Sequence, residues 1–214
     1  LRGWPGEVFD KRSSSVHALL TPDAIIESIA YLIANPVAAG AVRYAKDWPG
    51  AQTLPAHVGT RVIRVTRPKH YFNSDRSDWP EELELRLEMP VALQLDYGPE
   101  LARERIAERV RDKQHQAWNE ANRSGRSFVG PRRVLKVAHT KRARSYEVFG
   151  SLNPQFAAAG HRGAATQAVK RLRAFLAQYR LALAKWTTGD RSACFPAGTW
   201  WMRVCHGARC GPAP

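Results

Sequence analysis

The chain has 214 residues, of which 44% are hydrophobic and 24% are charged, so it is long enough for one ordinary domain with an extension or for two small domains. The hydrophobic fraction excludes an intrinsically disordered chain, and no stretch has the apolar length of a membrane span, so we expect a soluble protein without a membrane partner. The 33 Lys and Arg residues outnumber the 19 Asp and Glu residues, which gives a formal net charge of +14 at pH 7.

The first predicted element is a helix over residues 22–36, inside the stretch TPDAIIESIAYLIANPVAAG. Thr21 is the expected N-cap, and Pro22 suits the first helical position. Asn35-Pro36 predicts the end of the helix, and Gly40 is well placed to close the turn after it. At helical spacing the aliphatic side chains gather on one side, which predicts the core face Ile25, Ile26, Ile29, Leu32 and Ile33.

The opposite side of this helix is polar and carries Tyr31 and Asn35, which are four residues and therefore about one turn apart. Tyr31 is thus predicted to point away from the core. On spacing alone, the simplest interpretation is an amphipathic helix with an incidental surface tyrosine. A functional interpretation depends on the motifs around the helix.

Two short strands are expected next. Residues 61–66 (RVIRVT) are rich in β-branched side chains, and leucines alternate with charged residues from 82 to 88. These segments predict a small antiparallel sheet within residues 56–97. The connection includes residues 69–72 (KHYF), a basic and aromatic group that suits either contact with nucleic acid or the filling of a sheet edge.

Residues 98–122 predict a long helix, because no proline follows Pro99 and apolar residues recur at helical spacing. Its predicted apolar stripe is Leu101, Ile106, Val110, Ala117 and Trp118.

Positive charge is concentrated behind this helix. Residues 123–185 hold 14 basic residues and one acidic residue, Glu147, whereas residues 1–122 are close to neutral. A basic block of this size, in a chain with interleaved aromatic residues, is typical of a nucleic-acid binder; an acidic protein partner and a merely solvated surface are the alternatives. The densest part of the block predicts phosphate contacts by Arg132, Arg133, Lys136, Lys141, Arg142 and Arg144.

The C-terminal end is expected to hold a core helix and a strand. Residues 166–185 have helical periodicity, and residues 195–205 are rich in aromatic and β-branched side chains, which predicts a final strand. Cys205, His206 and Cys210 resemble half of a zinc site, but their spacing is poor and no second CxxC pair exists. We therefore expect ordinary reduced thiols.

Several ordered motifs around the first helix resemble one family. The segments YLIANPV (31–37), AGAV (39–42) and DWP (47–49) follow one another, and LRGWPGEVFDKR (1–12) precedes them. This series is similar to the tyrosine segment of the REP-associated tyrosine transposases, which are HUH-type single-strand DNA transposases. The resemblance implies that Tyr31 attacks a DNA phosphate and that Asn35 helps to hold a divalent metal, Mg²⁺ or Mn²⁺.

The sequence departs from that family at one motif. The two-histidine His-x-His motif does not occur, since no two of the seven histidines lie two positions apart. A phenol is almost wholly protonated near pH 7, so phosphodiester attack needs help, for example from a metal that polarises the phosphate. Asn35 offers one metal ligand and the two imidazoles are missing. We therefore expect a C-terminal portion of such a transposase that does not cleave DNA by itself.

These observations predict an α+β fold in three parts. Residues 1–55 are expected to be the C-terminal part of the transposase HUH domain, residues 56–97 the antiparallel β segment, and residues 98–214 a basic, mainly helical extension that binds DNA.

The expected function of the intact form is DNA transposition, in which single-stranded or hairpin DNA is cleaved and rejoined through a phosphotyrosine intermediate. The alternative is a truncated, non-catalytic nucleic-acid-binding protein. The resemblance also implies a cytoplasmic, nucleoid-associated location, and a homodimer is compatible with it.

Overall fold

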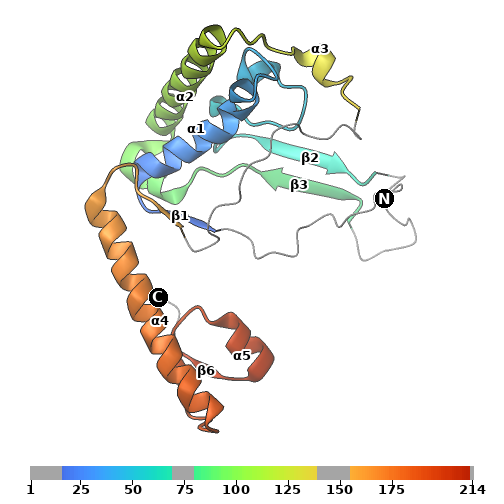
Figure 1. Ribbon diagram of the computed structural model, residues 1–214. Helices are drawn as coiled ribbons and strands as arrows, with labels where there is room; N and C mark the ends of the chain where they lie inside the picture. Colours follow the sequence, from blue (N-terminus) through green and yellow to red (C-terminus); the bar gives the residue numbers. More distant parts are fainter. Residues whose placement is uncertain (1–15, 69–79, 139–154, 213–214) are drawn as a thin grey trace. The chain divides into compact units, whose positions relative to one another are not determined.

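The computed structural model describes residues 16–68, 80–138 and 155–212 (Figure 1). The chain is mixed α+β, as the sequence predicts, and it divides into two compact units, Leu1–Gln155 and Phe156–Pro214. Each unit is built around its own hydrophobic cluster. The boundary between the units lies inside the predicted basic extension. Among the described helices, none has both the length and the apolar character that crossing a membrane requires.

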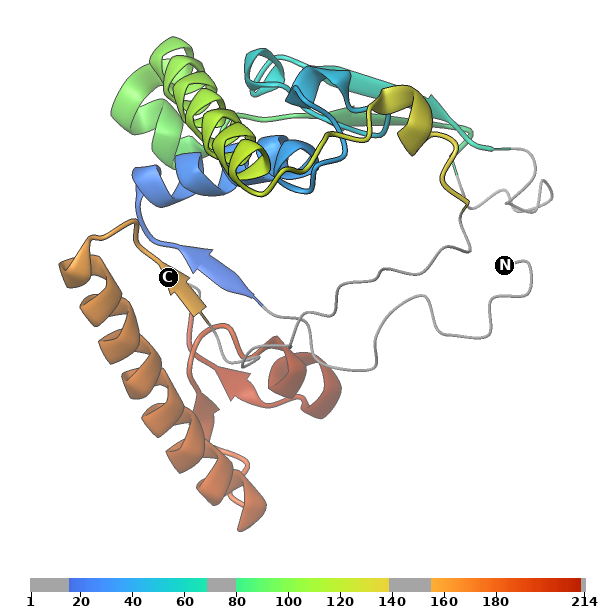
Figure 2. The same ribbon diagram turned by 45° about the horizontal axis from the view of Figure 1, so that its top comes forward.

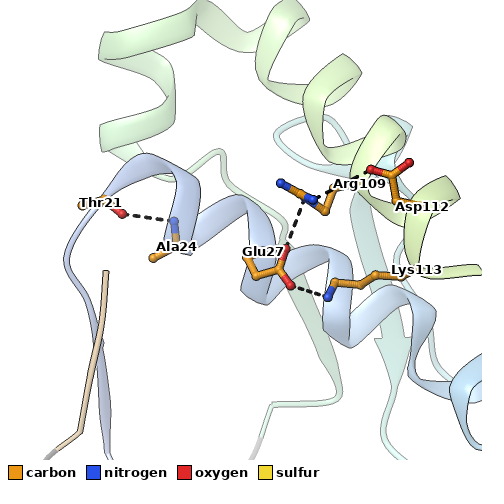
Figure 3. Close-up of polar contacts among 6 residues, drawn as sticks. All are labelled: Thr21, Ala24, Glu27, Arg109, Asp112 and Lys113. Carbon is orange, nitrogen blue, oxygen red and sulfur yellow. Dashed lines mark hydrogen bonds and ion pairs between the residues drawn. The ribbon is translucent and has the colours of Figure 1, made fainter. Parts of the chain in front are cut away.

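Helix α1 (Pro22–Ala38) begins where the sequence predicts, because the Ala24 N–H donates to Thr21 Oγ1 at 3.2 Å (Figure 3). Its predicted end is wrong by two residues, since the helix continues through Pro36. A proline has no N–H to donate to the carbonyl of Leu32, so the helix passes this position without that one hydrogen bond.

The helix then closes in a Schellman motif around Gly40, whose φ is +73°. The Gly40 N–H donates to the Val37 carbonyl and the Ala41 N–H donates to the Pro36 carbonyl, both at 2.9 Å. A positive φ favours glycine here, which confirms that Gly40 closes the turn after the helix.

The buried face of α1 is close to the predicted one but is shifted toward small residues. Ile26 and Ile33 are buried, and Ile25 and Ile29 are partly buried against the same cluster. Leu32 was wrongly placed in the core: it borders an open apolar groove of about 460 Å³ that Ile63 and Leu85 also line. The other buried α1 residues are Ala24, Ala30, Ala34 and Val37.

Short elements lie on either side of α1 and lead to the predicted hairpin. They are β1 (His17–Leu19) and the 3₁₀ turns η1 (Ala45–Asp47) and η2 (Pro55–His57). Strands β2 (Val62–Thr66) and β3 (Glu82–Arg86) pair antiparallel, which confirms both predicted strands. The basic and aromatic group at residues 69–72 lies outside the described residues.

The register in the middle of this hairpin pairs apolar residues with apolar residues and charged residues with charged residues. Ile63 pairs with Leu85 and Val65 with Leu83, so one face is apolar, while Arg64 faces Glu84 on the other. Val65, Leu83 and Leu85 are each more than half exposed. The hairpin therefore contributes little to the core.

Helix α2 (Val91–Arg123) lies side by side with α1 in both views (Figures 1 and 2). It is kinked at Gly98, whose φ of 70° and ψ of 163° are not helical. The part that follows Gly98 is the predicted long helix, and the turn before it was not predicted. Leu101 was wrongly placed in its buried stripe, since it is 43% exposed and the neighbouring Ala102 is buried instead. The small side chain of Ala102 allows the two helix backbones to approach closely.

The second unit consists of a long helix with three short elements packed on one side of it (Figure 2). Helix α4 (Arg162–Thr187) confirms the helix predicted over 166–185 and extends it at both ends. The short elements are β5 (Cys194–Phe195), α5 (Trp200–His206) and β6 (Arg209–Cys210), with β5 and β6 parallel. Strand β4 (Gln155–Ala157) precedes α4, and the four-residue helix α3 (Pro131–Val134) belongs to the first unit.

The strand predicted over 195–205 is wrong. The extended chain stops after Phe195, turns at Gly198 with a φ of +89°, and then forms α5. The Thr199 hydroxyl donates to the Pro196 carbonyl at 2.7 Å and stabilises the turn. The aromatic and β-branched side chains of this segment therefore lie on a helix.

Candidate functional site

Tyr31 and Asn35 both lie on the solvent side of α1, as their spacing predicts. The Tyr31 side chain is 57% exposed, and Asn35 is exposed as well. Neither side chain has a hydrogen-bond partner within the described part of the chain. Because no described residue is hydrogen-bonded to the Tyr31 hydroxyl and the residue is exposed, this hydroxyl is free to contact a ligand from solvent.

Tyr31 forms part of the wall of a groove between α1 and α2. The groove has a volume of about 270 Å³, and Asn35 is not among its lining residues. Its apolar floor includes Ala34 and Ala117, and its edges carry polar and charged side chains. The lining residues are Tyr31, Ala34 and Ala38 of α1, Lys113, Gln116, Ala117 and Glu120 of α2, and Arg126.

Glu27 links the two helices beside this groove (Figure 3). It lies four residues before Tyr31 on α1 and forms ion pairs with two cations of α2. Lys113 Nζ donates a hydrogen bond to Glu27 Oε1, and Arg109 Nε lies 3.2 Å from Glu27 Oε2 in an ion pair. Arg109 is also paired with Asp112. The positive charge of Lys113 is therefore largely compensated by a carboxylate of the protein.

Arg126 is the cation of the groove without a carboxylate partner in the described chain. It is exposed, and its Nε donates to the neutral Ser124 Oγ at 2.9 Å. The chain around it is held by backbone hydrogen bonds, because the Arg126 N–H donates to the Ala121 carbonyl at 2.9 Å. A guanidinium in this position can donate its remaining N–H groups to a phosphate.

The basic segment that follows is anchored to the end of α1. The Val129 N–H donates to the Gly40 carbonyl and the Gly130 N–H donates to the Ala41 carbonyl, both at 2.9 Å. Phe128 packs against the core cluster of the first unit. The helix that carries Tyr31 and the start of the basic segment are thus tied together.

Three of the six residues predicted to contact phosphates lie in the described part of the chain. Arg132 and Arg133 lie on α3, Lys136 lies just after it, and all three are exposed and without an ion-pair partner in the described structure. Lys141, Arg142 and Arg144 lie outside the described residues. Arg132, Arg133 and Lys136 are therefore free to pair with the negative charges of a polyanion.

Sequence reasoning missed Lys113 and Arg126. A usable signal was present for Lys113, since Lys113, Gln116, Ala117 and Glu120 recur at helical spacing and so share a face of α2. Arg126 follows the end of α2 in a turn, and no periodic pattern marks it.

The described residues do not complete a metal site around Asn35. Asn35 supplies one amide oxygen, and the described part of the chain contains no group of three or more His, Cys, Asp and Glu side chains that could hold a metal. The described residues thus do not assemble a site that fits Mg²⁺ or Mn²⁺. Cys194, Cys205 and Cys210 are free thiols, and the Thr199 hydroxyl lies 3.3 Å from Cys210 Sγ.

Comparisons with protein-family models, with curated proteins and with solved structures find no match to this chain.

Proposed function

We propose that this chain is a DNA-binding protein of the tyrosine-transposase type, which takes single-stranded or hairpin DNA at the groove beside Tyr31. One observation carries the proposal: the exposed Tyr31, whose hydroxyl has no partner in the described chain, shares a groove with the unpaired cation Arg126. A phosphate bound by Arg126 would lie on the Tyr31 side of α1. The motifs around Tyr31 support the same assignment.

The basic segment supports the same partner. Arg132, Arg133 and Lys136 are exposed cations on a segment that is hydrogen-bonded to the end of α1. Lysine and arginine side chains of this kind neutralise phosphates without reading bases, so they add affinity and little sequence preference. The groove and this segment would then follow one strand of DNA.

The reaction that the resemblance implies is a transfer of a phosphoryl group to Tyr31. The tyrosine oxygen forms a bond to phosphorus as it loses its proton, and the bond from phosphorus to the 3′ oxygen breaks. The 3′ oxygen takes up a proton and leaves as a hydroxyl, while the 5′ phosphate stays on Tyr31. Arg126 would orient the phosphate and offset its charge.

A second candidate function is DNA binding without cleavage. It is favoured by the lack of a His-x-His motif in the sequence and by the incomplete set of metal ligands beside Asn35 in the described residues. Both candidates require the same DNA-binding surface. They differ in whether a form of the protein that supplies the missing ligands makes a covalent adduct.

Binding of labelled oligonucleotides in a mobility-shift experiment tests the proposal. Single-stranded, hairpin and duplex DNA of equal charge are titrated with the protein at low salt, and polyglutamate is added as a competitor that carries charge without bases. We expect the single strand and the hairpin to shift and to survive excess polyglutamate. The absence of any shift would refute both candidates, and complete displacement by polyglutamate would favour an acidic protein partner.

A further inference from the structure

Helix α5 exposes two consecutive tryptophans. Trp200 is 62% exposed and Trp201 is 71% exposed, whereas Phe195 in the same unit is 1% exposed. Met202 is the one buried residue of the helix. Large aromatic side chains are normally buried when a core is available, so this pair is available for a partner.

The unit that carries α5 is strongly basic. Residues 156–214 contain nine Lys and Arg residues and one acidic residue, Asp190, which gives a formal net charge of +8. The side-chain and backbone hydrogen bonds from Ser192 lower the pKa of Asp190, so this carboxyl stays ionised and offsets only one of the nine cations. A surface of this sign attracts polyanions and repels cationic partners.

An arginine lies over one of the exposed rings, and a histidine ring contacts the other. The Arg203 guanidinium carbon lies 5.4 Å from the ring centroid of Trp200, and the rings of Trp201 and His206 meet edge to face with centroids 6.3 Å apart. Exposed aromatic faces next to arginine are the combination with which proteins hold unpaired bases: the ring stacks on the base and the cation meets the neighbouring phosphate.

We infer that α5 is a stacking platform for unpaired bases of single-stranded DNA, with Trp200 and Trp201 as the stacking residues and Arg203 as a phosphate contact. The inference rests on the proposed DNA-binding function and adds a second contact surface to it. It also extends the partner chemistry, because phosphate contacts alone do not distinguish a strand with exposed bases from any other polyanion.

A nucleic acid fits this surface better than a membrane does. Helices that lie in a bilayer interface present a continuous apolar face of bulky side chains. Helix α5 has seven residues. Apart from the two tryptophans, its exposed apolar side chains are Val204, which is 74% exposed, and Cys205. Flat indole rings with little aliphatic surface around them suit stacking on bases.

The test compares two oligonucleotides of equal length and charge, one of deoxythymidine and one with abasic sites throughout. Binding is measured by fluorescence anisotropy with the full chain and with two double variants. Trp200→Leu with Trp201→Leu keeps apolar area but removes the aromatic faces, and Trp200→Phe with Trp201→Phe keeps aromatic faces. Far-UV circular dichroism and the thermal midpoint check that each variant is folded.

We expect the wild type to prefer the thymidine strand by at least about fivefold, the low end for one stacked base. The leucine variant should lose this preference while keeping the affinity for the abasic strand, and the phenylalanine variant should keep most of it. Equal binding of both strands by the wild type, or a preserved preference in the leucine variant, would overturn the inference and leave the proposed function standing.

Two further outcomes identify other failures. If the wild type binds neither strand, the proposed function fails and the inference fails with it. If the wild type has no base preference but binds vesicles of phosphatidylcholine with phosphatidylglycerol, and the leucine variant does not, α5 is a membrane contact and the inference is wrong.

Discussion

Neutralising the cations on and just after α3 should reduce the salt dependence of DNA binding by a calculable amount. Each phosphate contact with a single strand contributes about 0.7 to the slope of log affinity against log salt concentration. Arg132, Arg133 and Lys136 are exposed and unpaired in the described structure, so each is free to make such a contact. Changing all three to glutamine should lower the slope by about 2, and the double variant Arg132→Gln with Arg133→Gln by about 1.4.

The affinity ratio between low and moderate salt makes this difference easy to measure. Between about 50 and 200 mM salt, a slope change of about 2 corresponds to a roughly 16-fold smaller loss of affinity. The assay is fluorescence anisotropy of a labelled single strand at several salt concentrations, with circular dichroism to confirm folding.

A matched control removes the same charge from a different surface. Arg64 and Arg86 are both exposed and both paired with Glu84 on the outer face of the hairpin. Changing these two to glutamine lowers the net charge as much as the double variant does. We expect the slope of the control to stay near that of the wild type. If the control and the double variant change the slope equally, the effect is one of net charge, and the reasoning about specific contacts is refuted.

Three further predictions concern the first unit. In a form of the protein that supplies the missing histidines, Tyr31→Phe should abolish the covalent DNA adduct on denaturing gels and change affinity by less than about twofold, since only a hydroxyl is lost; an adduct that persists would remove Tyr31 from the mechanism. Thr21→Ala should lower the free energy of unfolding by about 1 kcal/mol in urea titrations, because Ala24 N–H loses its capping acceptor, and a change near zero would mean that the cap does not contribute. Ile106→Ala, at a fully buried position between α1 and α2, should cost about 2–5 kcal/mol, whereas Leu95→Ala, at 79% exposure, should cost less than about 0.5 kcal/mol; similar losses for both would contradict the packing described for α2.

The parts of the fold that were predicted correctly depend on local signals. Thr21 and Pro22 specify the start of α1 through the backbone groups next to them, and Gly40 closes it for the same reason. The outward direction of Tyr31 follows from helical spacing alone. Strands β2 and β3 could be predicted because β2 is rich in β-branched residues and leucines alternate with charged residues in β3.

The parts that were missed depend on contacts far apart in the sequence. Pro36 was expected to end α1, yet the helix continues to Ala38 and buries Val37 in the core cluster of the first unit, several of whose other members lie far away in the sequence. The groove beside Tyr31 is formed where α1 packs against α2, whose residues Lys113 and Ala117 lie more than 80 positions after Tyr31 in the sequence. Spacing shows which residues share a helix face but not which second helix covers that face.

Helix α5 was missed for a different reason. It has seven residues and only Met202 is buried, so no apolar periodicity distinguishes it from a strand, and the tryptophans and Val204 have high β propensity. The turn at Gly198 and the hydrogen bond from the Thr199 hydroxyl to the Pro196 carbonyl end the extended chain, and the helix begins directly after them.

The most direct test of the central claim is the effect of Arg126 on DNA binding. Arg126 lines the groove beside Tyr31, whereas Arg111 is an equally exposed and unpaired arginine of α2 that does not line it. We expect Arg126→Gln to weaken binding of a single-stranded oligonucleotide at low salt by about tenfold, as the loss of a charged hydrogen bond to phosphate implies, and Arg111→Gln to weaken it by less than about twofold. Equal effects of the two substitutions, or no effect of Arg126→Gln, would contradict the claim that DNA lies in the groove beside Tyr31.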